Sequence, residues 1–237
     1  ATYGREGRWG ICSEVRVLAL SDEVDDRLWA ADMRQLAPDL IVGCGDVPFE
    51  TLGHLADSSG APVVFVPGNH DPDLSGYRDT REGLVVHAGF VSEPPWPAGT
   101  LNADGRVIEV SGVALAGLGG SPRYRRGPNQ YTEREQARRV RRLVRRTRWQ
   151  ARRHGLRVSI VVTHAAPRGV GDAEDPPHAG FDCYHHLVRA LRPQLLLHGH
   201  VNPLGGQREH RLGTTRVVNV FDHRLIQLDP EPLSTRL

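Results

Sequence analysis

The stretch Val63-Val64-Phe65-Val66-Pro67-Gly68-Asn69-His70-Asp71 joins a short apolar run to a polar turn. The β-branched and aromatic residues of its first half are typical of a buried strand. Burial does not require the second half, in which an amide, an imidazole and a carboxylate follow one another. Such ligands at the carboxyl end of a strand suit a metal site in an open α/β sheet. Because turns favour Asn and Asp in any case, the weight of this motif depends on partners elsewhere.

Strands and helices alternate around this stretch. From residue 15 to the end of the apolar run, the pattern predicts strands at 15–20, 40–42 and 62–66 and helices at about 26–36 and 48–56. After a Pro- and Gly-rich connection, it predicts strands at 84–87, 106–110, 113–118, 158–162, 194–197, 215–220 and 225–228 and helices at 132–154 and 183–191. The Thr132 to Glu135 spacing is that of a capping box. The alternation indicates an α/β protein.

Length and composition set wide bounds. With 237 residues, 39% of them hydrophobic, the chain can bury a full core, and we expect one domain at 15–237 after a loose lead-in at 1–14. Three cysteines without paired spacing argue against a disulfide framework and a thiolate zinc site. No stretch approaches about 20 apolar residues, so we expect a soluble, cytoplasmic protein without a membrane span.

Possible metal ligands follow five of the predicted strands. They are Asp22, Asp46, Asn69-His70-Asp71, His164 and His198-Gly199-His200. Each one alone is ordinary, since a single Asp after a strand usually caps a turn or helix and a single His is usually a hydrogen-bonded imidazole. The joint pattern favours a metal site over coincidence.

In this order the motifs resemble the calcineurin-like metallophosphoesterase superfamily. The residues that carry the resemblance are Asp22, Gly45-Asp46, Gly68-Asn69-His70-Asp71, His164 and Gly199-His200, which span most of the chain. The resemblance implies a four-layer α/β/β/α sandwich, in which two mixed sheets are flanked by helices and the site lies at the strand ends. It also implies the hydrolysis of a phosphate ester with metal-activated water.

The resemblance assigns a role to each matching residue. Asp46 would bridge two metal ions, and Asp22 would bind the first. Asn69, His164 and His200 would complete the second. His70 would donate a proton to the leaving oxygen or orient the phosphate, and Asp71 would orient His70. Two ions sharing a carboxylate can activate water and neutralise phosphoryl charge.

Two departures from the family pattern fall on the first metal. Val24 and Asn202 stand where histidines are usual. The carbonyl of Asn202 remains a candidate ligand, and Glu23 or Asp25 could supply oxygen, although Asp25 also suits the cap of the next helix. We therefore expect one or two divalent ions per chain. Oxygen in place of nitrogen favours Mn²⁺, with Fe, Zn²⁺ and Mg²⁺ as alternatives.

The basic residues of this chain are all arginines, crowded between Arg123 and Arg157. We interpret residues 121–155 as an Arg-rich helical insertion. Arg123, Arg125 and Arg126 on its loop, with His178 on a later loop, are candidate substrate-binding residues. The arginines of the helix could form a phosphate-backbone track. The net charge of +2 instead favours a solvated face that pairs with acidic residues elsewhere.

The sequence therefore predicts a metal-dependent hydrolase of phosphate esters. The expected substrate is a phosphorylated small molecule or nucleotide, with phosphodiesters preferred by analogy within the superfamily. One alternative is a degenerate member that binds a nucleotide or partner without turnover, for which Val24 and Asn202 are the best support. Another is a nucleic-acid-binding protein that uses the Arg-rich helix.

Overall fold

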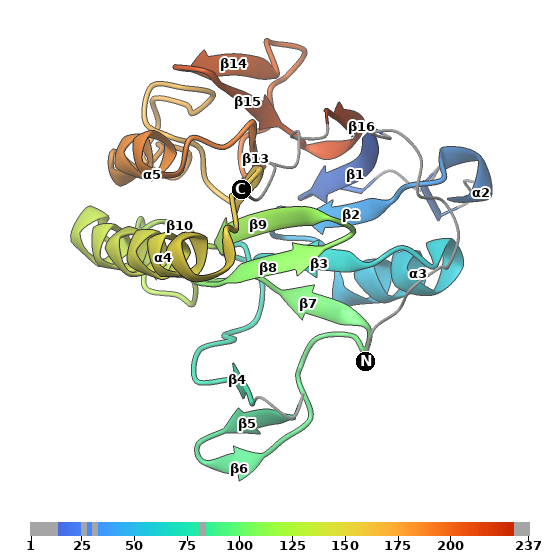
Figure 1. Ribbon diagram of the computed structural model, residues 1–237. Helices are drawn as coiled ribbons and strands as arrows, with labels where there is room; N and C mark the ends of the chain where they lie inside the picture. The colour runs from blue at the N-terminus through green and yellow to red at the C-terminus, as the bar shows by residue number, and fades with distance from the viewer. Residues whose placement is uncertain (1–13, 25–27, 30–32, 81–83, 230–237) are drawn as a thin grey trace.

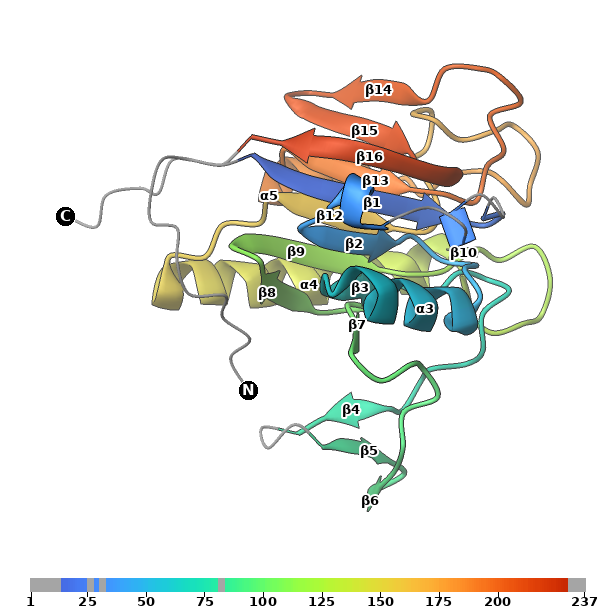
Figure 2. The same cartoon turned by 90° about the vertical axis from the view of Figure 1, so that its right-hand side faces the viewer.

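The main body of the protein has four layers (Figures 1 and 2). The computed structural model describes residues 14–24, 28–29, 33–80 and 84–229, without the side chains of Arg78 and Asp79. Two mixed sheets lie face to face, and helices cover the outer face of each. The predicted α/β/β/α sandwich is confirmed.

The first sheet has five strands in the order β16-β1-β2-β3-β7. It consists of β1 (Val15–Ser21), β2 (Leu40–Gly43), β3 (Val63–Phe65), β7 (Thr100–Asn102) and β16 (Asp222–Leu228). Strands β1, β2, β3 and β7 are parallel to one another, and β16 is antiparallel to β1. The opening motif therefore lies on β3, beside the central strand of this sheet.

The second sheet has six strands in the order β14-β15-β13-β12-β9-β8. It consists of β8 (Val107–Val110), β9 (Val113–Leu118), β12 (Ile160–Thr163), β13 (Leu195–His198), β14 (Glu209–Leu212) and β15 (Thr215–Asn219). The four inner strands are parallel, and the edge strands β8 and β14 are antiparallel to their neighbours.

Three apolar clusters hold the layers together. Val42 and Val64 of the first sheet meet Leu115 and Ile160 of the second in a fully buried core between the sheets. The second cluster lies beneath α2 (Met33–Leu36) and α3 (Phe49–Ser59), and the third beneath α4 (Glu133–His154) and α5 (Cys183–Leu191). Continuous apolar runs in the central strands follow from burial on both faces.

Helix α4 is the crossover connection between the parallel strands β9 and β12. It therefore belongs to the outer layer of the fold and is not an insertion into it. Thr132 and Glu135 form the predicted capping box at its start, and Gly155, with a φ of 69°, ends it. Val140, Leu143 and Val144 pack its apolar stripe against the second sheet.

Several short elements complete the described chain. β4 (Arg78–Asp79), β5 (Val85–His87) and β6 (Phe90–Val91) form a small sheet that extends from the main body in both views (Figures 1 and 2). β10 (Ser121–Pro122) pairs with β11 (Gln130–Tyr131) just before α4. The expected lead-in lies almost entirely outside the described residues. So does part of the predicted helix at 26–36, whose described end is α2.

The parallel strands of the two sheets bring their carboxyl ends to neighbouring edges. The loops that follow the strands are bonded across the two sheets: Nδ1 of His164, after β12, donates to the carbonyl of Cys44, after β2. Within the described part of the chain, no helix has the length and apolar character needed to cross a bilayer.

Candidate metal centre

Side chains that follow different strands converge where the two sheets meet. Asp22 follows β1, Asp46 follows β2, His164 follows β12 and His200 follows β13. Each offers a ligand atom within 4.8 Å of those of the other three. Asn69, after β3, places its amide oxygen 3.0 Å from Nε2 of His164. Five of the six residues predicted to bind metal thus lie together.

The spacing of the donor atoms suits a shared cation. Nε2 of His164 lies 3.0 Å from Oδ1 of Asn69 and 3.2 Å from Oδ2 of Asp46. Donors that each bind one ion at about 2.1 Å are separated by roughly 3 to 3.5 Å. Both distances from Nε2 of His164 therefore fall in the range expected between two ligands of one ion.

Backbone carbonyls fix the tautomer of both histidines. Nδ1 of His164 donates to the carbonyl of Cys44 at 2.8 Å, and Nε2 of His200 donates to that of Pro177 at 2.7 Å. The remaining ring nitrogens are Nε2 of His164 and Nδ1 of His200, and Nε2 of His164 can bind a cation only after it loses its proton. A second hydrogen bond of this kind orients metal-binding imidazoles in general.

Three of these residues have left-handed backbone conformations. The φ angles are 60° for Asp22, 56° for Asp46 and 68° for His200. Such conformations cost non-glycine residues on the order of 1–3 kcal/mol each and gather at functional sites. The amide of His200 donates to Oδ2 of Asp22 at 2.8 Å, which joins the loops of the two sheets.

The glycines beside the ligands are packed too closely to bear a side chain. A Cβ on Gly68 would overlap the Asp46 carboxylate, and a Cβ on Gly199 would overlap the Ser21 side chain. Neither position has a positive φ, so close approach, and not backbone conformation, requires glycine here. The Gly-Asn and Gly-His pairs of the motifs thus have a steric cause.

Burial and charge shift the pKa values of the ligands. Burial would lower the pKa of His164, but the hydrogen bond and charge of Asp46, together with the charge of Asp22, raise it to about 9. Burial and the neighbouring His164 lower the pKa of His200 to about 3. Burial also raises the pKa of Asp22. A cation must therefore displace a proton from His164, whereas His200 is already neutral.

Comparison with known proteins gives this cluster a family. A model described as calcineurin-like phosphoesterase matches residues 18–203, a range that contains all five converging residues. The chain belongs to the calcineurin-like phosphoesterase family. No curated protein sequence matches it.

Solved structures share the fold of this chain. The crystal structure of TT1561 of Thermus thermophilus matches with a TM-score of 0.58 and 16% identity, and a further crystal structure with a TM-score of 0.57 and 16% identity. Each match covers 92% of this chain and 100% of the other. At this identity the similarity concerns the fold alone.

His70 and Asp71 occupy different environments. His70 is exposed, and its amide donates to Oδ1 of Asp46 at 2.8 Å. It lines a cavity of about 280 Å³ together with Asp22, Asp46, Asn69 and His200, whereas His164 is buried behind them. This space is called the metal cavity. The Asp71 carboxylate instead accepts from the amides of Gly68, at 2.7 Å, and Asp46, at 2.9 Å. These bonds do not involve the His70 ring, so the orienting role of Asp71 stays a prediction. Asp71 positions the loops that carry Asp46 and Asn69.

The two departures from the phosphoesterase pattern have clear positions. Val24 packs against the apolar cluster beneath α2 and α3, so it faces away from the ligands. Glu23 and Asn202 line the 280 Å³ cavity. The side-chain oxygen of Asn202 accepts from the amide of Leu204, which leaves its metal-binding role a prediction. Asp25 lies outside the described residues.

The candidate substrate loops contribute unequally. Arg123 donates hydrogen bonds to Glu135 and to the carbonyl of Gln130. None of the three predicted arginines is among the described residues that line the metal cavity. His178 does line it. So does Tyr124, whose hydroxyl accepts from Nδ2 of Asn69 at 3.2 Å. Sequence reasoning missed Tyr124, whose only signal is its place in the Arg-rich loop.

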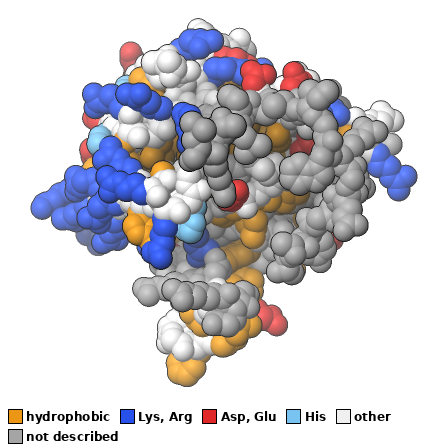
Figure 3. Space-filling view, in the orientation of Figure 1, with side chains coloured by type: hydrophobic (Ala, Val, Ile, Leu, Met, Phe, Trp, Pro, Cys, Tyr) orange, Lys and Arg blue, Asp and Glu red, His pale blue; other side chains and the backbone are white. Residues whose placement is uncertain are grey.

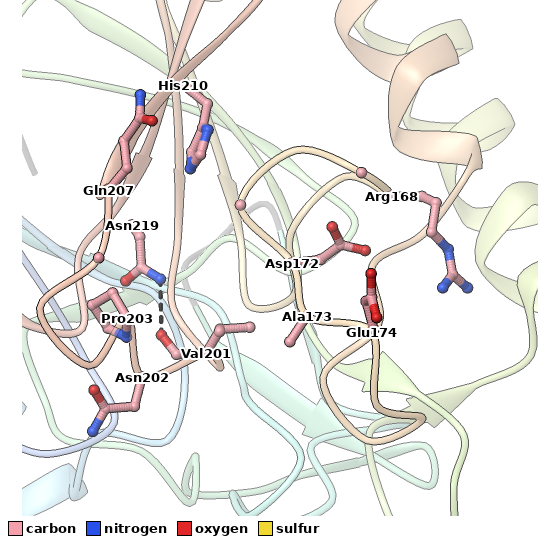
Figure 4. Close-up of a pocket in the computed structure, with 13 residues that line it drawn as sticks. Arg168, Asp172, Ala173, Glu174, Val201, Asn202, Pro203, Gln207, His210 and Asn219 are labelled. Atoms are coloured by element: carbon pink, nitrogen blue, oxygen red, sulfur yellow. Dashed lines mark hydrogen bonds between the residues drawn. The ribbon is translucent and has the colours of Figure 1, made fainter.

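A larger cavity of about 600 Å³ adjoins the metal cavity (Figure 4). Asn202 lines both cavities. In the close-up, the carboxylates of Asp172 and Glu174 lie on one side, and Gln207 and His210 lie on the other. The walls thus offer hydrogen-bond donors and acceptors to a polar organic group.

The protonated state of His164 predicts a pH-dependent affinity for metal. Because its pKa is raised to about 9, the imidazole carries a proton at neutral pH that the cation must displace. The dissociation constant for Mn²⁺ should therefore rise by about tenfold for each unit of pH lost below about 9, which calorimetry between about pH 6.5 and 8.5 can measure. A constant affinity across that interval would contradict this assignment.

Proposed function

We propose that this calcineurin-like phosphoesterase hydrolyses phosphodiesters at the centre formed by Asp22, Asp46, Asn69, His164 and His200. The observation that carries the proposal is the convergence of these five groups at an open cavity that four of them line together with the exposed His70. Nitrogen and oxygen donors next to a free imidazole match the needs of phosphoryl transfer, in which charge must be neutralised and a leaving oxygen protonated.

The donor set supports Mn²⁺ as the cation. The carboxylate oxygens of Asp22 and Asp46 lie beside the imidazoles of His164 and His200, each of which can bind a cation in its neutral form. Val24 packs against the apolar cluster and supplies no ligand. An oxygen-rich first position at Asp22 and Glu23 favours a hard ion over Zn²⁺. When bound, a divalent cation supplies charge neutralisation for the phosphoryl oxygens and lowers the pKa of water. Asp46, Asn69, His164 and His200 form the more complete position, and Asp22 with Glu23 the weaker one.

His70 is the candidate proton donor. Its amide is held by Asp46, so its position is fixed relative to the metal ligands while its ring remains exposed in the cavity. Imidazole is the side chain best suited to exchange a proton near neutral pH. His70 therefore stands where it can protonate a leaving oxygen or bind the phosphate.

The adjoining cavity supports a diester over a monoester. A diester carries a second organic group, and the 600 Å³ cavity beside Asn202 offers polar walls to receive one. A small monoester would leave this space unused. This preference rests on the shared position of Asn202 between the two cavities.

The proposal is tested with bis(4-nitrophenyl) phosphate and 4-nitrophenyl phosphate in the presence of Mn²⁺. We expect faster turnover of the diester, and His70→Ala should lower kcat by about 10²- to 10⁴-fold without loss of bound metal. His186→Ala, on the exposed face of α5, is the matched control and should keep full activity. Metal lost from the His70 variant would mean that His70 is a ligand. No hydrolysis of either ester would favour a non-catalytic binding protein.

A further inference from the structure

Helix α4 presents a continuous row of arginines to solvent. We call these residues the arginine face, and they are Arg134, Arg138, Arg141, Arg142, Arg145, Arg148 and Arg152, all exposed. They recur every three or four residues, so they share one side of the helix. The opposite side, with Val140, Leu143 and Val144, is buried against the second sheet. In Figure 3 the basic side chains gather on the left, over the position of α4.

Among the described residues, the arginine face has no acidic partners. The sequence contains no Asp or Glu between residues 136 and 171. Among the residues that the structure describes, Arg139 pairs with Asp104 and Arg123 with Glu135, but no carboxylate lies within ion-pair distance of the arginine face. The described residues therefore do not supply the acidic partners that we expected for these arginines. In the described part of the chain, these seven positive charges face solvent.

The shape of the face restricts that partner. Its 22-residue helix is about 33 Å long, close to one turn of duplex DNA at about 34 Å. The charges repeat once per helical turn along a straight line, which suits an extended polyanion better than a compact one. Trp149, 55% exposed, lies on the same side and adds an aromatic surface among the arginines. Because the apolar side of α4 is buried, the helix cannot insert into a bilayer.

We propose that the arginine face binds the phosphate backbone of a nucleic acid. Arginine forms charge-assisted hydrogen bonds with phosphate oxygens, and neutralising several phosphates releases counterions, so binding should be independent of sequence and strongly weakened by salt. The proposal does not depend on hydrolysis at the metal centre. It concerns a different surface and can be tested on the metal-free protein.

The test measures fluorescence anisotropy of labelled oligonucleotides of about 20 residues, as DNA duplex and as single-stranded RNA, between about 25 and 200 mM NaCl without metal. Arg138→Gln with Arg145→Gln should weaken binding by at least about tenfold at low salt and reduce the slope of log affinity against log salt by roughly 2. The corresponding Lys variants should retain most of the affinity, because phosphate contacts need positive charge.

The control is Arg34→Gln with Arg211→Gln, which removes the same charge from exposed positions outside α4. Its affinity should stay within about twofold of the unmodified protein, as the contacts are local. Equal losses in the two double variants would reduce the effect to net charge and overturn the proposal. So would competition by polyglutamate as effective as that by DNA, or binding to anionic vesicles without binding to either nucleic acid.

Discussion

Replacing Asp46 with Asn is expected to lower phosphoesterase activity by more than roughly 10- to 100-fold, the loss typical when a residue that only supports the metal ligands is replaced. Asp46 is the residue predicted to be shared by both ions, and its Oδ2 lies 3.2 Å from Nε2 of His164. The variant keeps an oxygen for the His70 amide, so the loop should stay in place while the charge is lost. Metal content and kcat with Mn²⁺ should fall together.

The same variant should change the pKa of His164. The Asp46 carboxylate is the main group that raises this pKa to about 9, so NMR titration of metal-free Asp46→Asn should find a lower value. Asp57→Asn, exposed on α3, is the matched control and should leave activity, metal content and the His164 titration unchanged. Full activity in Asp46→Asn would exclude the proposed centre.

Replacing Gly68 with Ala is expected to disable the centre without touching a ligand. The added Cβ would overlap the Asp46 carboxylate and lie 2.6 Å from the Asp46 amide nitrogen, so one of the two ligand loops must move. Such overpacking typically destabilises a protein by about 1–3 kcal/mol. We expect the affinity for metal to fall by at least about tenfold, as is typical when a residue that supports the metal ligands is replaced. Activity should fall by a similar factor.

Gly53→Ala is the control for this substitution. Its Cβ would meet Pro97 at 3.4 Å, an ordinary contact, and Gly53 lies within α3. Helical glycines replaced by alanine commonly gain up to about 1 kcal/mol, so this variant should be as stable as the original protein or more so. Calorimetric unfolding and metal binding compare the two directly. Unchanged metal binding in Gly68→Ala would show that the loops tolerate the displacement.

Most of the fold is readable from local sequence signals. The apolar runs at β1, β2, β3, β9 and β13 and the capping box of α4 mark elements whose pattern agrees with their burial. Strand β14 has no such signal, because Glu209–Leu212 is a half-buried edge strand of mostly charged residues. Strand β7 has none either, because Thr100–Asn102 lies within a Pro- and Gly-rich connection.

The residues that could bind metal can also be predicted from the sequence, whereas the backbone conformations and hydrogen bonds that position them cannot. Asp46 and His164 follow strands and can be recognised by that position. The left-handed conformations of Asp22 and His200 depend on how two sheets meet, which local sequence does not encode. The carbonyl of Cys44 that orients His164, and the bonds of Asp71 to backbone amides, likewise arise from tertiary contacts.

The arginines of α4 differ from the sequence-based expectation for a similar reason. A near-zero net charge suggests that acidic residues balance the basic ones, and this holds for the chain as a whole. The balance does not hold locally in the described part of the chain, because Glu135 pairs with Arg123 and Asp104 with Arg139, and neither pairs with the arginine face. Net charge therefore gives no information about a single surface.

The most direct test of the account is an anomalous-scattering map from crystals grown with Mn²⁺. We predict a peak within about 2.0–2.4 Å of ligand atoms from Asp46, Asn69, His164 and His200, stronger than any peak beside Asp22 and Glu23. A map in which Mn²⁺ binds elsewhere, or leaves these four side chains without a peak, would contradict the proposed metal centre and the hydrolase built on it.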